Sequence, residues 1–241
     1  MPLKLFLLHG MGGSIADWDA VTAKIPSTAL PLPEPASSPV QCASALADEI
    51  EKSAAGAFAL GGYSMGGRLA ILTAVELFSR GIPPSKLVLV SAGLGLSSEK
   101  ERSARNAADA AWADLAARDP QEFWRNWYDQ ELFASYRALP PDRKQGWEKA
   151  RLSMNIGRLM GQLRHLGPGR HEHLVPLLEG LLEKGVRVLY IVGELDKKYV
   201  ELSRIVGEMK GAQVTVIPDA GHILPLETPE LLANKIRDFL N

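Results

Sequence analysis

A serine, an aspartate and a histidine follow three separate apolar runs of the chain: Ser64, Asp196 and His222. A serine hydroxyl alone is a poor base and a poor nucleophile, so a neutral imidazole must take its proton. A carboxylate must also fix the tautomer of that imidazole and stabilise the imidazolium that forms. The three residues therefore predict a Ser-His-Asp triad, whose general-base help contributes ~10² to 10⁴-fold in rate.

The serine lies in Gly62-Tyr63-Ser64-Met65-Gly66, which matches the G-x-S-x-G nucleophile elbow. An apolar run that predicts a buried strand precedes it, and an apolar-periodic helix follows. Glycines without a Cβ let strand and helix approach closely while the serine hydroxyl projects beyond the sheet. The turn also directs the Met65 backbone N–H, at a helix N-terminus, toward a developing negative charge, as in an oxyanion hole.

A second oxyanion donor is expected from the loop after the first strand, His9-Gly10-Met11-Gly12-Gly13. Serine-dependent enzymes of this type take an N–H from such a loop, and Met11 is the candidate here. His9 itself is interpreted as a structural residue that hydrogen-bonds the loop, with a catalytic role as the alternative.

Asp196 follows a strand at the loop position that the fold uses for its acid, while Glu194 and Asp219 remain alternative acids. His222 lies in the last loop before the C-terminal helix. That place favours catalysis over the alternative of a core histidine.

The order Ser, Asp, His is that of the α/β-hydrolase fold. Strand-like runs alternate with amphipathic helices, which predicts right-handed βαβ units and a mostly parallel central sheet with flanking helices. In such a sheet the strand ends share one edge, so distant residues can meet there. The expected strands are Leu3–Leu8, Ala29–Leu30, Phe58–Leu60, Leu87–Val90, Val186–Val192 and Gln213–Ile217.

The alternation stops between residues 97 and 170, where every pattern is helical. Asp119 and Pro120 mark an N-cap followed by proline at N1, and Thr228 and Pro229 mark another before the final helix. We expect residues 97–170 to form an inserted helical lid, and residues 1–96 and 171–241 to form the α/β-hydrolase core.

The composition suits one α/β domain with an insertion, since 46% of the 241 residues are hydrophobic and 23% are charged. A formal net charge of -1 argues against a non-specific binder of nucleic acid or of a membrane surface. The single cysteine, Cys42, excludes an internal disulfide framework and predicts a cytoplasmic protein.

No apolar stretch approaches the ~18 to 20 residues needed to span a bilayer, so we expect no membrane insertion. His165, His171 and His173 with Glu172 do not have the spacing of a metal site, and no metal or cofactor is predicted. The sequence does not indicate the oligomeric state.

Over nearly its whole length the chain resembles the α/β-hydrolase superfamily. Within this superfamily, the chain contains the motifs Gly62–Arg68, Glu99–Asn106, Phe123–Trp124 with Trp127–Tyr128, Phe133–Ser135 and Gly193–Lys198. In these motifs it resembles the 2-succinyl-6-hydroxy-2,4-cyclohexadiene-1-carboxylate synthases of menaquinone biosynthesis. The resemblance implies a cofactor-independent lyase whose triad removes a proton conjugated to a carbonyl. It implies that pyruvate is eliminated from 2-succinyl-5-enolpyruvyl-6-hydroxy-3-cyclohexene-1-carboxylate.

The resemblance also implies a small polycarboxylate substrate held by Arg68, Arg105 and Arg151, in a pocket lined by Tyr63 and Trp127. Arg68 is one helical turn beyond Ser64, so it can reach the same pocket mouth. Guanidinium groups bind carboxylates through paired hydrogen bonds, which suits a polyanion.

Two other functions stay open. A carboxylesterase or C–C hydrolase for a small acidic substrate would use an acyl-serine and water. A non-catalytic ligand-binding member of the fold is the third hypothesis, although a receptor has no need to keep all three triad residues.

Overall fold

The computed structural model describes residues 3–54 and 56–241. Its centre is a six-stranded sheet in the order β2-β1-β3-β4-β5-β6, and every neighbouring pair is parallel. This is the α/β-hydrolase architecture that the alternating pattern predicts. The strands are β1 (Lys4–Leu8), β2 (Ser27–Leu30), β3 (Phe58–Tyr63), β4 (Lys86–Val90), β5 (Arg187–Gly193) and β6 (Ala212–Ile217).

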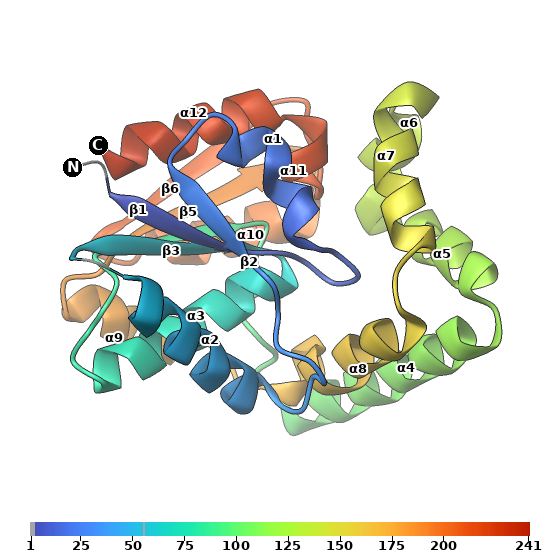
Figure 1. Ribbon diagram of the computed structural model, residues 1–241, viewed down its shortest axis with the longest axis horizontal. Coiled ribbons are helices and arrows are strands. Elements are labelled where there is room, and N and C mark those ends of the chain that lie inside the picture. Colours follow the sequence, from blue (N-terminus) through green and yellow to red (C-terminus); the bar gives the residue numbers. More distant parts are fainter. Residues whose placement is uncertain (1–2, 55) are drawn as a thin grey trace.

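Helices cover both faces of the sheet (Figure 1). On one side lie α2 (Pro39–Ser53), α3 (Met65–Ser79) and α9 (Val175–Glu183), and on the other α1 (Asp19–Thr22) and α12 (Pro229–Leu240). β3 and β4 are buried along their whole length, because continuous apolar runs suit a parallel sheet covered on both faces. The remaining core helices are η1 (Ile15–Trp18), α10 (Lys197–Gly207) and α11 (Leu224–Glu227).

Between β4 and α9 the chain is helical, as the sequence pattern predicts. These helices stand beyond the carboxyl ends of the strands, with α4 and α8 side by side and α6 and α7 across from α11 (Figure 1). Their action as a lid stays a prediction. They are α4 (Glu99–Arg118), α5 (Pro120–Asp129), η2 (Glu131–Phe133), α6 (Ala134–Ala138), α7 (Pro141–Leu152), α8 (Ile156–Leu166) and η3 (Pro168–Arg170).

The two predicted helix caps differ in outcome. Asp119 caps α5, because its Oδ1 accepts the Glu122 N–H at 2.9 Å. Thr228 occupies the N-cap of α12 but makes no capping hydrogen bond, which corrects the expectation. Its ψ of 53° departs from the extended backbone that aims a cap hydroxyl at the helix.

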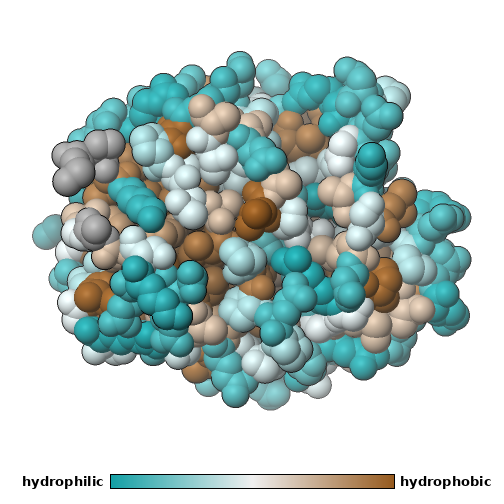
Figure 2. Space-filling model, in the orientation of Figure 1, coloured by the Kyte–Doolittle hydropathy of each residue, from teal (hydrophilic) through white to brown (hydrophobic). Residues whose placement is uncertain are grey.

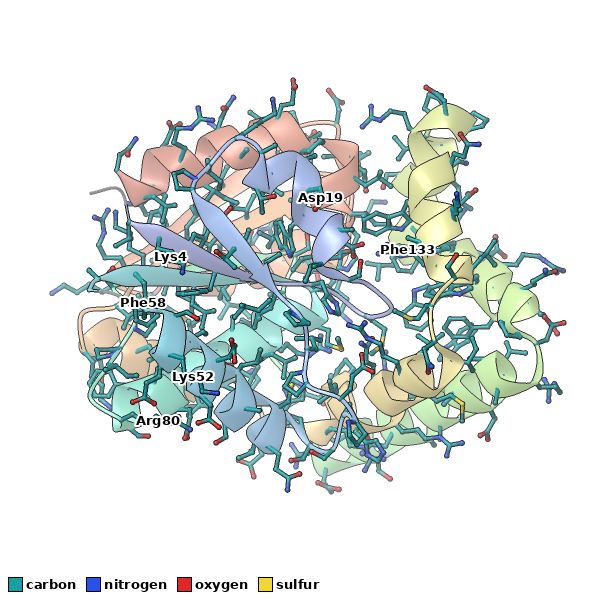
Figure 3. All side chains as sticks on the ribbon, viewed as in Figure 1. Lys4, Asp19, Lys52, Phe58, Arg80 and Phe133 are labelled. Carbon is teal, nitrogen blue, oxygen red and sulfur yellow. The ribbon has the colours of Figure 1, made fainter. Side chains whose placement is uncertain are left out.

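Hydrophilic residues cover most of the surface in the view of Figure 2, and hydrophobic residues are scattered among them. Figure 3 shows Phe133 facing the α/β core from the helices between β4 and β5. Within the two described ranges, no helix has the length and apolar content to cross a membrane.

Candidate active site

The turn between β3 and α3 holds Ser64 in a strained backbone conformation, with φ of 53° and ψ of -110°. Only glycines fit around it. A Cβ on Gly62 would lie 2.3 Å from the Gly66 carbonyl, and one on Gly66 would lie 2.3 Å from the Leu8 oxygen. Strain of this kind is found at nucleophile elbows, where it exposes the serine hydroxyl.

His222 connects the serine to a carboxylate. Its Nε2 lies 3.2 Å from Ser64 Oγ, and its Nδ1 lies 2.6 Å from Asp196 Oδ2. Both contacts are satisfied when Nδ1 carries the proton and donates to Asp196, which leaves Nε2 free to accept the serine proton. Asp196 and His222 are buried. The arrangement has the geometry of a general-base triad.

The alternative acids lie elsewhere. Glu194 Oε2 accepts the backbone N–H of Asp219 at 3.2 Å, and both side chains belong to exposed residues. The structure therefore places Asp196 against the imidazole of His222, and not Glu194 or Asp219.

Aromatic rings surround the imidazole of His222. Its ring centroid lies 4.7 Å from that of Tyr199, 5.4 Å from Tyr63 and 5.9 Å from Phe133. Phe133 comes from the helices after β4, so the two parts of the chain together enclose the imidazole. An apolar wall on several sides strengthens the electrostatic interactions of the triad by excluding water.

The loop after β1 is fixed from both sides. The Gly12 N–H donates to Gln162 Oε1 of α8 at 2.9 Å, and the Gly13 N–H donates to the Gly10 oxygen at 3.1 Å. His9 is fully buried, with Nδ1 2.9 Å from the Gly10 oxygen and Nε2 3.0 Å from an Arg158 nitrogen. Burial lowers the pKa of His9 to about 4, so it is neutral at neutral pH. These contacts support the structural interpretation of His9.

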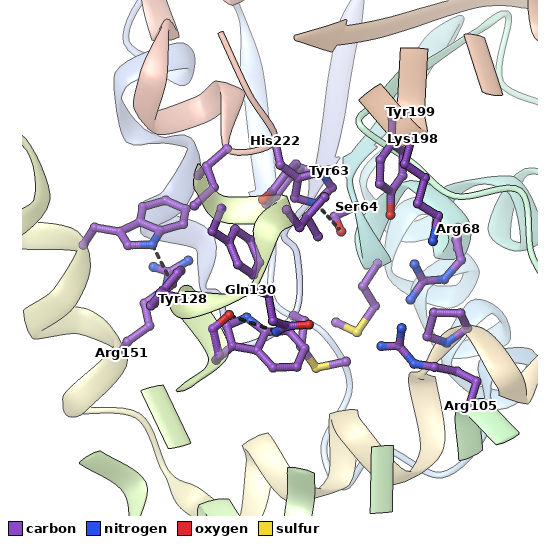
Figure 4. A pocket seen from close by; sticks show the side chains of 18 of the residues that line it. Tyr63, Ser64, Arg68, Arg105, Tyr128, Gln130, Arg151, Lys198, Tyr199 and His222 are labelled. Atoms are coloured by element: carbon purple, nitrogen blue, oxygen red, sulfur yellow. Dashed lines mark hydrogen bonds between the residues drawn. The ribbon is translucent and has the colours of Figure 1, made fainter. Parts of the chain in front are cut away.

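Nearly all of the residues that the sequence predicts for the site line one pocket (Figure 4). Among them only Asp196 does not line it, because Asp196 lies behind His222. The lining residues are Met11, Tyr63, Ser64, Met65, Arg68, Leu96, Arg105, Trp127, Tyr128, Gln130, Leu132, Phe133, Trp147, Arg151, Pro168, Lys198, Tyr199, His222 and Ile223.

Three cationic side chains gather at one end of this pocket: Arg68, Arg105 and Lys198 (Figure 4). Arg105 Nε donates to Asp109 Oδ1 at 2.8 Å. Although Lys198 as a residue is exposed, partial desolvation of its ammonium group and the two nearby guanidinium groups lower its pKa. Arg105 is the one of these three cations that forms an ion pair with Asp109, so this end of the pocket has an excess of positive charge that suits a polyanion.

Arg68 is held in place from behind. It is 4% exposed, its Nε donates to His171 Nε2 at 3.1 Å and its Nη2 donates to the Leu166 oxygen at 3.2 Å. Burial lowers the pKa of Arg68 to about 10, so the group is protonated at neutral pH. Burial, followed by the charge of Arg68, lowers the pKa of His171 to about 3, so His171 acts as a neutral acceptor. Arg68 is thus oriented before any substrate binds.

Arg151 lines the opposite end of the pocket, but its guanidinium group already has a partner (Figure 4). Its two terminal nitrogens lie 2.6 and 2.7 Å from the carboxylate oxygens of Asp17. It also stacks on the Trp147 ring at 3.4 Å. Both side chains of the ion pair are 3% exposed. A substrate carboxylate at Arg151 would have to share or displace Asp17.

Sequence reasoning missed several pocket residues. Lys198 closes the motif Gly193–Lys198 and Tyr128 closes an aromatic motif, so both stood in segments already singled out. Asp17 and His171 do not line the pocket but hold its arginines, and they have no such signal, because their partners lie 134 and 103 residues away.

The alpha/beta hydrolase family model matches residues 5–235. A putative 2-succinyl-6-hydroxy-2,4-cyclohexadiene-1-carboxylate synthase of Bacillus subtilis (strain 168) is 32% identical over 248 residues, covering 97% of this chain and 88% of that protein. The 2-succinyl-6-hydroxy-2,4-cyclohexadiene-1-carboxylate synthase of Serratia proteamaculans (strain 568) is 28% identical over 98% of this chain and 92% of its own length. The structure of MenH from S. aureus superposes with a TM-score of 0.90 at 25% identity, over 99% of this chain and 93% of that one.

Proposed function

The chain belongs to the alpha/beta hydrolase family, and we propose that within this family it is a cofactor-independent carbon–oxygen lyase of menaquinone biosynthesis. The proposed reaction is the one for which its relatives are named. It converts 2-succinyl-5-enolpyruvyl-6-hydroxy-3-cyclohexene-1-carboxylate to 2-succinyl-6-hydroxy-2,4-cyclohexadiene-1-carboxylate and pyruvate. A cytoplasmic location stays a prediction from the sequence.

In the proposed mechanism, Ser64 Oγ takes a substrate proton from a carbon conjugated to a carbonyl and passes its own proton to His222 Nε2, 3.2 Å away. The electrons of the broken C–H bond form a C=C bond between C2 and C3, the ring double bond shifts from C3–C4 to C4–C5, and the C5–O bond to the enolpyruvyl group breaks. The leaving enolpyruvate takes up a proton and becomes pyruvate. Asp196 stabilises the imidazolium during the transfer.

Negative charge develops on the conjugated carbonyl oxygen as the proton leaves. We assign its stabilisation to the backbone N–H groups of Met11 and Met65, both of which belong to residues that line the pocket beside Ser64. Losing one donor of this kind costs about 3 to 4 kcal/mol.

One observation carries the proposal: Arg68, Arg105 and Lys198 line the same pocket as Ser64 and His222. A buried guanidinium group costs desolvation free energy that an enzyme for neutral esters has no reason to spend. Several cations recover it when a substrate with more than one carboxylate binds. The charge excess therefore favours an acidic substrate.

The proposal includes the division into a core of residues 1–96 and 171–241 and a lid of residues 97–170. The segment between β4 and β5 supplies Arg105, Trp127 and Arg151 to the pocket, while the core supplies the triad. Substrate would thus be bound between the two parts.

The test supplies the purified protein with the enolpyruvyl cyclohexene dicarboxylate, made in situ by the preceding enzyme. Pyruvate release and conjugated-diene absorbance should rise in equal amounts with the wild type and not with Ser64→Ala. If neither exceeds the spontaneous rate while activated esters give a stoichiometric burst, the protein is instead a carboxylesterase or C–C hydrolase that forms an acyl-serine.

A further inference from the structure

The carboxylate of Glu227, at the end of α11, binds the peptide N–H groups on both sides of His222. Its Oε2 accepts the Gly221 N–H at 2.7 Å, and its Oε1 accepts the Ile223 N–H at 2.8 Å. Hydrogen bonds to an ionised acceptor are shorter and roughly twice as strong as neutral ones. One side chain therefore holds the peptide planes before and after the imidazole.

The same carboxylate also contacts the helices between β4 and β5. Ser135 of α6 donates its hydroxyl to Glu227 Oε1 at 3.2 Å. A Cβ on Gly221 would lie 1.9 Å from Ser135 Oγ, so α6 lies directly on the loop. Arg143 of α7 donates to the carbonyl oxygens of Leu226 and Glu227 at 2.8 and 3.1 Å. Glu227 thus joins the loop of His222 to these helices, which face α11 in Figure 1.

The start of the loop is held by different contacts. The Leu195 N–H donates to the Ala220 oxygen at 2.8 Å, which ties the loop to the segment that carries Asp196. Beyond Ala220, the contacts of Glu227 with Gly221 and Ile223 fix the backbone that carries the imidazole.

We propose that Glu227 is a positioning residue that aligns His222 between Asp196 and Ser64, and that Ser135 couples this alignment to the docking of α6. The proposal rests on the proposed function only in taking His222 as the catalytic base. It follows from the three donors around one carboxylate, which are the Gly221 N–H, the Ile223 N–H and the Ser135 hydroxyl.

Glu227→Gln is the decisive substitution. The amide keeps one acceptor oxygen but presents its NH₂ group to a peptide N–H, so donor faces donor and one N–H loses its partner. A shift of the imidazole by about 1 Å costs on the order of 10²-fold in rate. We expect kcat to fall by about 10- to 100-fold and KM to stay within about threefold, because the cations of the pocket are untouched.

Three readouts separate alignment from a merely structural role: turnover, the rate at which a fluorophosphonate labels Ser64, and the low-field proton resonance of His222 Nδ1–H in ¹⁵N-histidine-labelled protein. Glu227→Gln should slow turnover and labelling and should shift or broaden the His222 resonance. Glu230→Gln is the matched control, since Glu230 is exposed on α12 and pairs with Lys24 at 3.1 Å.

A double-mutant cycle tests the coupling to α6. On its own, Ser135→Ala should slow the labelling of Ser64 severalfold. In the Glu227→Gln background it should cause no further slowing, because Ser135 acts through Glu227. Additive effects would overturn the coupling. If the Glu227→Gln protein fails to fold, the Ser135→Ala variant alone tests the proposal. Labelling of Ser64 in Ser135→Ala at the wild-type rate would then refute it.

The proposal is also overturned if the Glu227→Gln variant has a Ser64 labelling rate and a turnover rate within twofold of those of the wild type, together with an unchanged His222 resonance. If the wild-type protein is labelled at Ser64 but releases no pyruvate, the proposed lyase function is wrong. The role of Glu227 is then tested by the labelling rate and by the His222 resonance.

Discussion

Asp17→Asn should lower the free energy of unfolding by several kcal/mol and leave the fold intact. Asp17 binds both terminal nitrogens of Arg151, at 2.6 and 2.7 Å, and both side chains are 3% exposed. The amide retains one acceptor, but its NH₂ group faces a guanidinium group that can only donate. Arg151 would then be a buried charge without a counter-charge.

Removing one partner of a buried ion pair costs about 3 to 5 kcal/mol. For a chain of this size, 1 kcal/mol shifts Tm by about 2 to 4 °C, so Tm should fall by roughly 6 to 20 °C. Asp19→Asn is the matched control, because Asp19 is exposed one residue beyond η1. Its effect should stay within about 0.5 kcal/mol.

Urea and thermal unfolding measure the difference. Replacing both partners by uncharged groups of similar size is often nearly neutral, so Asp17→Asn with Arg151→Met should recover much of the loss. A loss below about 1 kcal/mol for Asp17→Asn, or additive losses in the double variant, would refute the conclusion that the pair stabilises the fold as a buried unit.

The same variant tests whether Arg151 binds substrate, as the resemblance implies. Asp17→Asn frees the guanidinium group, so a substrate carboxylate that binds there should do so more tightly and KM should fall. An unchanged KM would mean that Arg151 is a structural residue that connects α7 to η1, and that the carboxylates of the substrate bind at the other end of the pocket.

Three further outcomes are expected. Ser64→Ala should lower kcat for pyruvate release by about a thousandfold or more, and activity above that level would exclude Ser64 as the catalytic group. Lys198→Met should raise KM by about tenfold with kcat nearly unchanged, while Lys197→Met, one residue away and not among the residues that line the pocket, should not; equal KM values would remove Lys198 from the site. Burial lowers the pKa of His9 to about 4 and of His171 to about 3, from 6.5 in the unfolded chain. The unfolded state therefore binds more protons below pH 6.5, and stability is lost as pH falls from 6.5 toward 4, by up to about 1.4 kcal/mol per pH unit for each histidine. Urea unfolding at pH 7 and pH 5 measures this, and equal stabilities would contradict the buried neutral state.

The sheet and the meeting of Ser64, Asp196 and His222 at one edge follow from local patterns. Each parallel strand is a short apolar run, and a catalytic side chain placed just beyond such a run lies at the carboxyl edge whatever the connecting helices do. Arg68 was within reach of prediction for the same reason, since it is fixed to Ser64 by one turn of α3. The residue types and their distance from a strand end were sufficient to predict that these side chains lie together.

The rest of the site depends on how the helices after β4 dock, and helical periodicity does not encode that. Asp17 is one of many acids near a helix start, and only the position of α7 makes it the partner of Arg151. Likewise, nothing in the sequence around Glu227 indicates that it has a different role from Glu230, three residues later. For Thr228 the sequence predicts a contact that is not formed, because the cap pattern is present but the backbone angle turns the hydroxyl away from the helix.

The distribution of charge in the pocket sets how an acidic substrate must lie. Arg151 is neutralised by Asp17, whereas Arg68 is oriented by His171 and faces the pocket with unused donors. Carboxylates should therefore bind at the Arg68 end, one helical turn beyond Ser64, which leaves the remainder of the substrate against the aromatic residues around His222. In that orientation the binding free energy of a remote carboxylate holds a C–H bond beside Ser64 Oγ, and no water is required at the reacting carbon. A hydrolase needs a water at that place after acylation, whereas the elimination proposed above does not, and anchoring of the substrate by its carboxylates is what that proposal requires.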